Sequence, residues 1–184
     1  MTVHISVRPI VLLAVLAAIV AGVLPAAAQA KKESADARLQ RFVDKEEIQN
    51  VLLEYGRALD ARDFTAYSNL FASDGEWIGG FGSVKGPANI KAFMEKNMGT
   101  NGNPTHNYHL LSNFVIAVNG DTATAWSRWA FVQPQKTGGA VIAQAGRYDD
   151  TFVRENGVWK FKKRTASNDT GGPAPAARPA SASK

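Results

Sequence analysis

The chain has 184 residues, a formal net charge of +5 and no cysteine. Without cysteine there is neither a disulfide framework nor a lipidated N-terminal cysteine, and an oxidising compartment demands nothing of the fold. Basic residues cluster only over 160–164, with no helix-turn-helix pattern and no aromatic stacking platform. We interpret that cluster as a solvated strand face and expect no nucleic-acid partner.

Residues 1–30 have the pattern of a cleavable secretory signal peptide. After a basic start at Arg8, the apolar run Ile10 to Leu24 is shorter than the roughly 20 residues needed to span a bilayer, and two overlapping A-x-A frames follow it. The alternative is a retained membrane anchor. We expect cleavage near Gln29 or Lys31, a periplasmic or secreted protein, and no stable membrane insertion afterwards.

The rest of the chain is expected to hold one domain. Residues 31–43 form a lead-in, 44–169 have the size of a single domain with one core, and 170–184 form a tail. The tail consists mainly of Gly, Pro, Ala and Ser without a large apolar residue, so its burial could not offset the entropy of ordering it. We predict that it is disordered.

Three helices are predicted in the first half of the domain. Asp44 and Glu47 have the spacing of a capping box, and they open an apolar series at helical spacing that ends near Asp60. A second, short helix has Asp63 as its cap. Pro87 suits the first turn of a third helix, after which apolar residues again recur at helical spacing.

Strands surround and follow the third helix. Asn119-Gly120-Asp121 and Asn156-Gly157 mark tight hairpins between long strands. Helices first and a meander last predict an α+β fold and exclude a parallel βαβ arrangement. The expected architecture is a conical, curved antiparallel sheet with three helices packed on its concave face, enclosing an apolar pocket. The predicted strands cover residues 76–78, 83–85, 106–118, 122–133, 141–154 and 158–166.

The strand over 106–118 carries apolar residues on both faces. Regular alternation places Leu110 and Phe114 on one face and Leu111 and Val115 on the other. An antiparallel sheet with one solvated face would alternate more cleanly, so we expect a second subunit to cover the outer face. The sequence therefore predicts a homo-oligomer, a trimer or a dimer.

His109 is the first candidate for chemistry, because imidazole takes up and releases protons near neutral pH. Regular alternation places it on one face with Leu111, Asn113 and Val115. On an apolar face, a histidine is more often a satisfied core residue than a catalyst. His106 falls on the opposite face and no H-E-x-x-H spacing occurs, so no metal site is expected.

Asp60 would lie at the negative end of the first helix's macrodipole, where a carboxylate is disfavoured, and such a misfit can mark a functional site. The alternative is an aspartate that joins two helices in a turn. Tyr55, on the apolar stripe of the same helix, would by default be a core tyrosine with a satisfied hydroxyl. These residues by themselves leave structural and catalytic roles open.

Longer motifs span residues 44–166: Ile48-Gln49-Asn50-Val51-Leu52, Leu70-Phe71-Ala72-Ser73-Asp74-Gly75-Glu76-Trp77, Gly86-Pro87, His109-Leu110-Leu111-Ser112-Asn113 and Asn156-Gly157-Val158-Trp159-Lys160. Together with the stretch from Tyr55 to Asp60, they resemble the nuclear transport factor 2-like superfamily, in its SnoaL-like and scytalone dehydratase-like branch. This superfamily hosts both enzymes and non-enzymes on one conical scaffold. Members of the branch commonly form trimers.

The arrangement is similar to that of bile-acid dehydratases and hexachlorocyclohexane dehydrochlorinase, which pair an aspartate at the first helix with a histidine on the third strand. The resemblance implies that Asp60 and His109 form a catalytic dyad, that Tyr55 is a catalytic tyrosine, and that Arg164 is a functional arginine near the last strand. Regular alternation places Arg164 with the strand's lysines, and only a bulge or strong curvature would turn it inward.

Asn113, Trp77 and Leu111 are the expected substrate-binding residues of such a site. The implied reaction is a cofactor-independent, dehydratase-type elimination on a small hydrophobic cyclic substrate. His109 would remove a proton, Asp60 would stabilise the imidazolium, and Tyr55 would protonate or hydrogen-bond the departing oxygen. The alternatives are a non-catalytic module that binds a small molecule or serves oligomerisation, and a ketosteroid-type isomerase that uses a carboxylate base.

Overall fold

The computed structural model describes residues 33–100, 102 and 106–171, and its part from Ser34 onward forms one compact unit. The predicted signal peptide and nearly all of the predicted tail lie outside these residues. No helix in the described ranges is long and apolar enough to cross a bilayer.

The described residues form three helices and six strands, in the predicted order. The α+β class is confirmed, and the four long strands extend slightly beyond most of their predicted ends. In chain order the elements are α1 (Ala35–Ala61), α2 (Phe64–Asn69), β1 (Phe71–Gly79), β2 (Gly82–Lys85), α3 (Pro87–Met98), β3 (Tyr108–Asn119), β4 (Thr122–Pro134), β5 (Ala140–Glu155) and β6 (Val158–Asn168).

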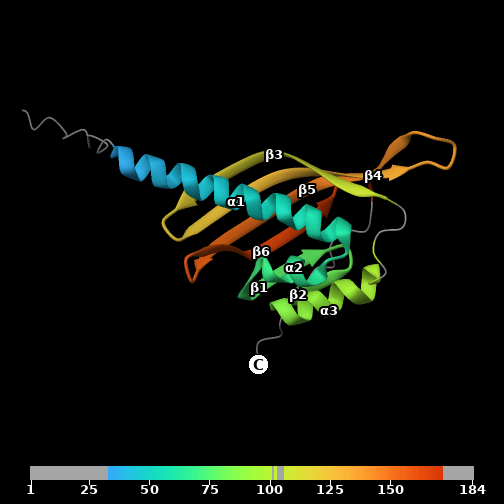
Figure 1. Cartoon of the computed structure of the whole chain (residues 1–184), viewed down its shortest axis with the longest axis horizontal. Coiled ribbons are helices and arrows are strands. Elements are labelled where there is room, and N and C mark those ends of the chain that lie inside the picture. The colour runs from blue at the N-terminus through green and yellow to red at the C-terminus, as the bar shows by residue number, and fades with distance from the viewer. Residues whose placement is uncertain (1–32, 101, 103–105, 172–184) are drawn as a thin grey trace, which may run out of the picture. The chain divides into compact units, whose positions relative to one another are not determined.

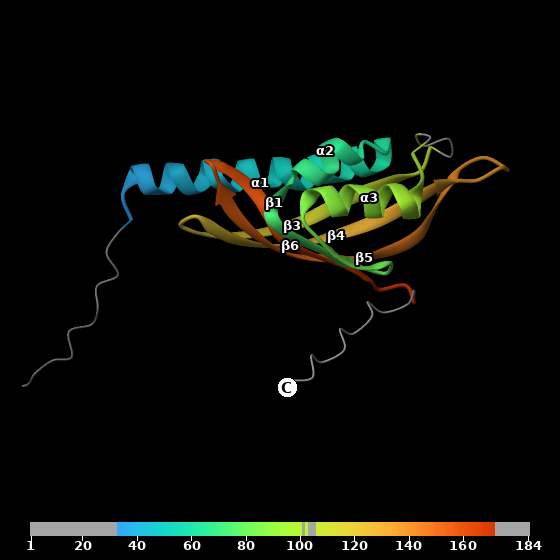
Figure 2. The same cartoon turned by 90° about the horizontal axis from the view of Figure 1, so that it is seen from below.

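The strands form one curved, open sheet in the order β2-β1-β6-β5-β4-β3. β3 to β6 are an antiparallel meander, and β1 joins it by a parallel pairing with β6. Figures 1 and 2 show the three helices on one side of this sheet, with α1 lying across the meander. The space between helices and sheet is therefore where both the core and a pocket can form.

The first helix begins earlier than the sequence predicts. Ser34 caps it by accepting a hydrogen bond from the Ala37 backbone N–H at 3.1 Å, and good helix formers follow. Asp44 is not a cap, so the predicted capping box is wrong. Its carboxylate is buried inside α1 and bonds the Arg154 guanidinium at 2.5 Å, which ties the helix to β5.

The other helix ends follow the predicted chemistry. α1 ends after Ala61 because Arg62 adopts a left-handed backbone with φ 58°, which leaves Asp60 in the last turn. Asp63 caps α2, accepting a hydrogen bond from the Ala66 N–H at 2.9 Å, and Pro87 occupies the first turn of α3. The predicted cap at Asp63 and the predicted place of Pro87 are both confirmed.

An aromatic group forms the centre of the core. The Phe161 ring centroid lies 4.7 Å from that of Phe152, 5.1 Å from Phe71 and 5.7 Å from Tyr55. Each of these side chains is at most 2 % exposed. Burial of one such side chain stabilises the fold by roughly 1.5–3 kcal/mol, so these contacts hold α1, β1, β5 and β6 together.

A bulge in β3 changes which residues face inward. The register with β4 shifts between Ser112 and Val115, and Asn113 within the bulge has φ 57°. Leu111 and Phe114 therefore both pack against the core, whereas Val115 is exposed. The prediction from regular alternation, which grouped His109 with Asn113 and Val115, is wrong because the bulge inserts an extra residue.

A second bulge decides the position of Arg164. Thr151 pairs with Lys163 and Phe152 pairs with Phe161, so Lys162 is the extra residue on β6. The shift turns the Arg164 side chain inward, where it is fully buried. From the sequence, an inward Arg164 required a bulge or strong curvature, and this bulge meets that requirement.

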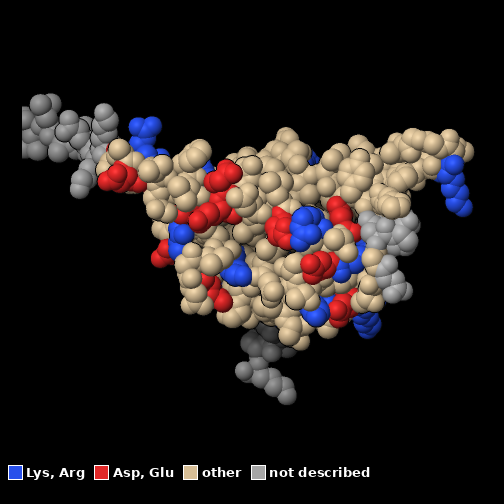
Figure 3. All heavy atoms as spheres, viewed as in Figure 1, with Lys and Arg blue, Asp and Glu red and all other residues tan. Residues whose placement is uncertain are grey.

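Charges of both signs are interspersed on the face that carries α1, as Figure 3 shows. One such pair is Glu54 with Arg57, 2.5 Å apart on the exposed side of the helix. Exposed pairs of this kind contribute little to stability.

Candidate functional site

A cavity of about 240 Å³ lies between the helices and the inner face of the sheet. Leu59, Met94 and Met98 contribute an apolar wall from α1 and α3. Aromatic side chains of Tyr67, Trp77, Trp129 and Tyr148 form most of the remainder, and the polar groups are Tyr55, His109, Gln144 and Asn168. A mostly apolar cavity with a few convergent polar groups is the usual form of a small-molecule site.

Both tryptophans of the cavity lie across glycines. A Cβ at Gly79 would come within 2.4 Å of the Trp77 indole, and a Cβ at Gly146 within 1.9 Å of the Ser167 carbonyl oxygen and 2.8 Å of the Trp129 indole. No real Cβ tolerates such contacts, so glycine is required for these ring positions. The sequence therefore sets the shape of two cavity walls through residues that have no side chain.

Asp60 and His109 are in direct contact, although they are far apart in the sequence. One Asp60 oxygen lies 2.6 Å from His109 Nδ1, and the other accepts a hydrogen bond from the His109 backbone N–H at 2.9 Å. The two side chains are 20 % and 12 % exposed. The helix end and the strand are thereby fixed to each other at this point.

This geometry assigns the two ring nitrogens different roles. Because Nδ1 faces a carboxylate, it carries the proton, and Nε2 is left with a lone pair. His109 lines the cavity, whereas Asp60 lies behind it. The arrangement can accept a proton from a bound molecule and stabilise the imidazolium that results.

Tyr55 lies at the centre of a hydroxyl network. Its oxygen accepts hydrogen bonds from the Tyr67 hydroxyl at 2.8 Å and from Trp77 Nε1 at 3.1 Å. Burial raises the pKa of Tyr67 well above its usual value of 10, so Tyr67 keeps its proton. With its acceptor positions filled, Tyr55 has its own proton left to donate.

Arg164 lies beneath the cavity and does not line it. It forms two hydrogen bonds with Asp150, at 2.8 and 2.7 Å, and both side chains are fully buried. Its guanidinium carbon lies 3.9 Å from the ring centroids of both Tyr55 and Tyr148. Burial lowers the pKa of Arg164, but Asp150 more than offsets this and raises it above its usual value, so the pair is ionic.

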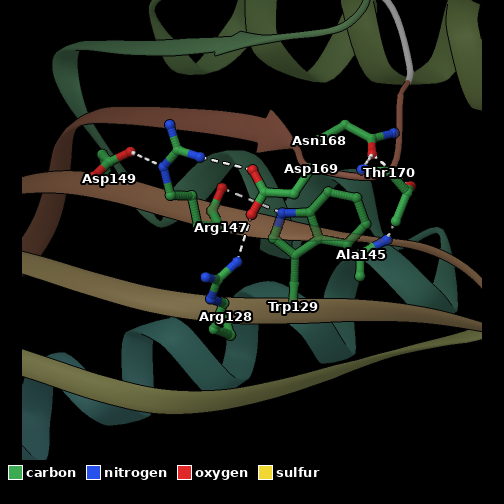
Figure 4. Close-up of polar contacts among 8 residues, drawn as sticks. All are labelled: Arg128, Trp129, Ala145, Arg147, Asp149, Asn168, Asp169 and Thr170. Carbon is green, nitrogen blue, oxygen red and sulfur yellow. Dashed lines mark hydrogen bonds and ion pairs between the residues drawn. The ribbon is translucent and has the colours of Figure 1, made fainter.

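A polar network on the sheet supports one edge of the cavity. In Figure 4 the Asp169 carboxylate joins Arg128 and Arg147, and the Arg147 carbonyl accepts a hydrogen bond from the Trp129 indole N–H at 3.3 Å. The Asn168 side chain accepts hydrogen bonds from the backbone N–H and hydroxyl of Thr170. These contacts hold two lining residues, Trp129 and Asn168, in place.

Of the three predicted substrate-binding residues, one lines the cavity and two do not. Trp77 lines the cavity, but Leu111 is half-buried against the core and is absent from the lining. Asn113 is exposed in the β3 bulge, so its predicted place beside His109 is wrong. Within the described ranges no group of three or more His, Asp or Glu side chains is arranged to hold a metal ion.

Sequence reasoning missed several groups at the site. Tyr148 and Trp129 are on strands, and nothing in their local pattern separates a cavity residue from a core residue. Asp150 follows Asp149 in the sequence, and only the structure shows that Asp150 is buried while Asp149 is exposed. Tyr67 was predicted to be buried, but its contact with Tyr55 depends on how α2 packs on α1.

A family model described as "SnoaL-like domain" matches residues 40–165, which include all of the groups above except Asn168, Asp169 and Thr170. The chain belongs to this family. The SnoaL-like chain is also 32 % identical over 127 residues to the uncharacterised protein Rv2910c of Mycobacterium tuberculosis, a match that covers 66 % of this chain and 82 % of that protein.

Solved structures agree with the family. An NTF2-like protein with a cystatin-like fold from Novosphingobium aromaticivorans has a TM-score of 0.64 and 27 % identity to the SnoaL-like chain, covering 76 % of this chain and 93 % of that one. A hexachlorocyclohexane dehydrochlorinase, LinA type 2, has a TM-score of 0.61 and 20 % identity, with coverage of 76 % and 93 %. At that identity the second likeness shows the fold alone.

Proposed function

We propose that this SnoaL-like protein is a cofactor-independent lyase that performs a dehydratase-type elimination on a small hydrophobic cyclic substrate. The observation that carries the proposal is the 2.6 Å contact between Asp60 and His109 at the wall of an aromatic cavity. A strand histidine with a purely structural role needs neither a carboxylate behind it nor a cavity before it.

In the proposed reaction, His109 Nε2 takes a proton from a ring carbon next to a carbonyl group. The electron pair of that C–H bond ends in a new carbon–carbon double bond, and the bond from the neighbouring carbon to a hydroxyl group breaks. The proton leaves with the hydroxyl as water. Asp60 stabilises the imidazolium between these steps, and Tyr55 donates a hydrogen bond to an oxygen of the substrate.

The size of the cavity limits the substrate. An apolar cavity of about 150 Å³ accommodates one benzene molecule. The 240 Å³ here therefore fits a substituted single ring or two fused rings. The dehydrochlorinase of similar fold is named for a substrate with one six-membered ring, which supports the same size class.

The second candidate is a non-catalytic module that binds a small hydrophobic molecule or serves oligomerisation. Exposed apolar side chains on the outer sheet face favour it: Leu110 is 51 % exposed and Val115 63 %. The two candidates share the cavity and differ in whether His109 moves a proton.

Export and assembly are also part of the proposal. The basis for export is the signal-peptide pattern of residues 1–30, and the basis for a dimer or trimer is the apolar outer face. Mass spectrometry of the exported protein tests the first: a chain that starts near Gln29 or Lys31 is expected. An intact N-terminus retained in the membrane would contradict it.

The elimination itself is tested with one-ring and two-ring cyclic β-hydroxy ketones, whose products are conjugated enones that absorb in the ultraviolet. We expect His109→Ala and Asp60→Asn each to lower the rate by roughly 100-fold to 10,000-fold. Because the two residues act as a unit, the double variant is expected to be no slower than the slower single variant.

Two matched controls lie close by in the chain. His106 is exposed outside the cavity, so His106→Ala should keep full activity. Asp63→Asn preserves a good helix cap, so it should do the same. The lyase proposal fails if His109→Ala retains the wild-type rate, or if ring compounds bind in the cavity but none of these ketones is converted.

A further inference from the structure

Tyr148 is a polar group of the cavity that the proposed proton transfer leaves unused. It lines the cavity, it is 3 % exposed, and its hydroxyl has no hydrogen-bond partner among the described residues. Burial raises the pKa of Tyr148 well above its usual value of 10, although Arg164 opposes this, so the hydroxyl keeps its proton. A buried donor that faces a cavity without a partner is available for a ligand.

The Arg164 guanidinium packs against the rings of both Tyr55 and Tyr148. The two rings pack edge to face with centroids 5.6 Å apart, and the guanidinium carbon of Arg164 lies 3.9 Å from each. Arg164 Nη1 is buried and has no hydrogen-bond partner within the described part of the chain. Its positive charge therefore acts on two phenol rings at close range, and it favours negative charge that develops near their hydroxyl oxygens.

The neighbours of Tyr55 complete the arrangement. The Tyr55 oxygen accepts one hydrogen bond from Trp77 Nε1, which can only donate, at 3.1 Å and another from the Tyr67 hydroxyl at 2.8 Å. The proton that Tyr55 still has to donate and the free proton of Tyr148 belong to groups that line the same cavity as His109.

We propose that Tyr55 and Tyr148 form a two-donor site for one ligand oxygen that carries negative charge, with Arg164 as a positioning residue beneath both rings. This inference rests on the proposed function and deepens it: the ketone substrates react through an enolate, which a halogenated hydrocarbon without a carbonyl group cannot form. When His109 removes the proton, the electron pair passes to the carbonyl oxygen, and the enolate then expels the hydroxyl from the neighbouring carbon.

The test uses 4-nitrophenol, a one-ring phenol whose ionised form absorbs visible light, and its methyl ether 4-nitroanisole, which cannot ionise. Wild-type protein should bind the phenolate and increase the ionised fraction of the probe at a fixed pH. Tyr55→Phe and Tyr148→Phe should each weaken phenolate binding roughly tenfold to a hundredfold, which is the effect of losing a hydrogen bond to a charged group.

The ether reports the shape of the cavity separately, and its affinity should be the same in wild type and both variants. Tyr108→Phe is the matched control, because Tyr108 is 44 % exposed and does not line the cavity. It should change neither affinity.

The inference is overturned if Tyr148→Phe binds the phenolate as tightly as wild type does, or if each variant loses affinity equally for the phenol and the ether. Neither probe needs turnover, so the result is separate from the lyase test. A protein that ionises the phenol but converts no ketone would keep the two-donor site and refute the lyase. A protein that converts the ketones but whose affinity for the phenolate is unchanged by Tyr148→Phe would support the lyase and refute the two-donor site.

Discussion

Asp60 uses both carboxylate oxygens on one residue, the first on the His109 ring and the second on its backbone N–H. This double contact fixes the ring and its tautomer together. The sequence identified both residues through family motifs, because neither helix nor strand periodicity brings them together. Tyr148 was not identified, because its strand pattern is the same for a cavity residue and a core residue. Asp150 was not identified, because its partner Arg164 is turned inward only by the β6 bulge.

Removing one partner of the Arg164–Asp150 pair is expected to destabilise the fold more than removing both. Arg164→Met leaves the Asp150 carboxylate buried without its partner and should lower the free energy of unfolding by about 3–5 kcal/mol. The double variant Arg164→Met with Asp150→Leu should recover most of that loss, since apolar side chains fill a similar volume.

Urea denaturation measures both free energies of unfolding. In the double variant the extra ionisation of bound 4-nitrophenol should also be lost, because the charge beneath the tyrosines is gone. A single Arg164→Met variant as stable as wild type would contradict the buried ion pair.

Gly79 is predicted to control the cavity through Trp77. In Gly79→Ala the new methyl group would lie within 2.4 Å of the indole, so Trp77 must move away from Tyr55. The affinity for 4-nitroanisole should fall. Gly80→Ala is the matched control, because Gly80 also lines the cavity but a Cβ there meets nothing within 4 Å. Equal affinities of the two variants, measured by absorbance titration, would show that Trp77 is not held as described.

At the scale of the elements, the structure differs from the sequence prediction in three features: the bulges in β3 and β6 and the earlier start of α1. The hairpins, the Asp63 cap and the order of the elements along the chain follow local rules, and they were predicted correctly. The bulges in β3 and β6 depend on how neighbouring strands pair, so alternation within one strand could not reveal them. Asp44 and Glu47 have the spacing of a cap, but tertiary burial of Asp44 overrides that local signal.

Asp44 is a second polar tie between α1 and the sheet, besides the contact of Asp60 with His109. Its Oδ1 lies 2.5 Å from Arg154 and 3.4 Å from Trp159 Nε1. Burial raises the pKa of Asp44, but the bonds from Arg154, Gln40 and Trp159 outweigh it and lower the pKa below its usual 3.8. Asp44→Asn should cost roughly 1–3 kcal/mol of stability at neutral pH, the range for a lost hydrogen bond to a charged group.

The pH dependence has a defined sign. Because the folded-state pKa is lowered, the stabilisation by Asp44 is fully present above its unfolded pKa, near 3.8, and is lost as the pH falls through the folded value. The stability difference between wild type and Asp44→Asn should therefore shrink only below about pH 4. A difference that is constant from pH 7 to below pH 3, measured by thermal denaturation, would contradict this role.

At the scale of the whole molecule, the sheet curves around the helices on one face and leaves apolar residues on the other. We predict a dimer or trimer through the outer face, since Leu110 and Val115 there are more than half exposed. Light scattering at micromolar concentration should report a multimer, and Val115→Lys with Leu110→Lys should convert it to a monomer that keeps its fold. A wild-type monomer would contradict the prediction.

The fold class and the pocket were predictable from the order of elements and the family motifs. The size of the pocket was not, because it depends on where two indoles come to lie against Gly79 and Gly146. The central claim is that His109, backed by Asp60, removes a proton from a carbon of a ring compound bound in this cavity. That step can be observed without knowing the leaving group.

The direct measurement is deuterium exchange into 2-tetralone, a two-ring ketone, followed by proton nuclear magnetic resonance in D₂O. The wild-type protein should exchange the α-protons far faster than buffer does, and His109→Ala should lower that rate by roughly 100-fold to 10,000-fold. His106→Ala should exchange like wild type. Exchange by wild type no faster than by buffer, with 2-tetralone shown to be bound, or equal exchange by His109→Ala, would contradict the claim.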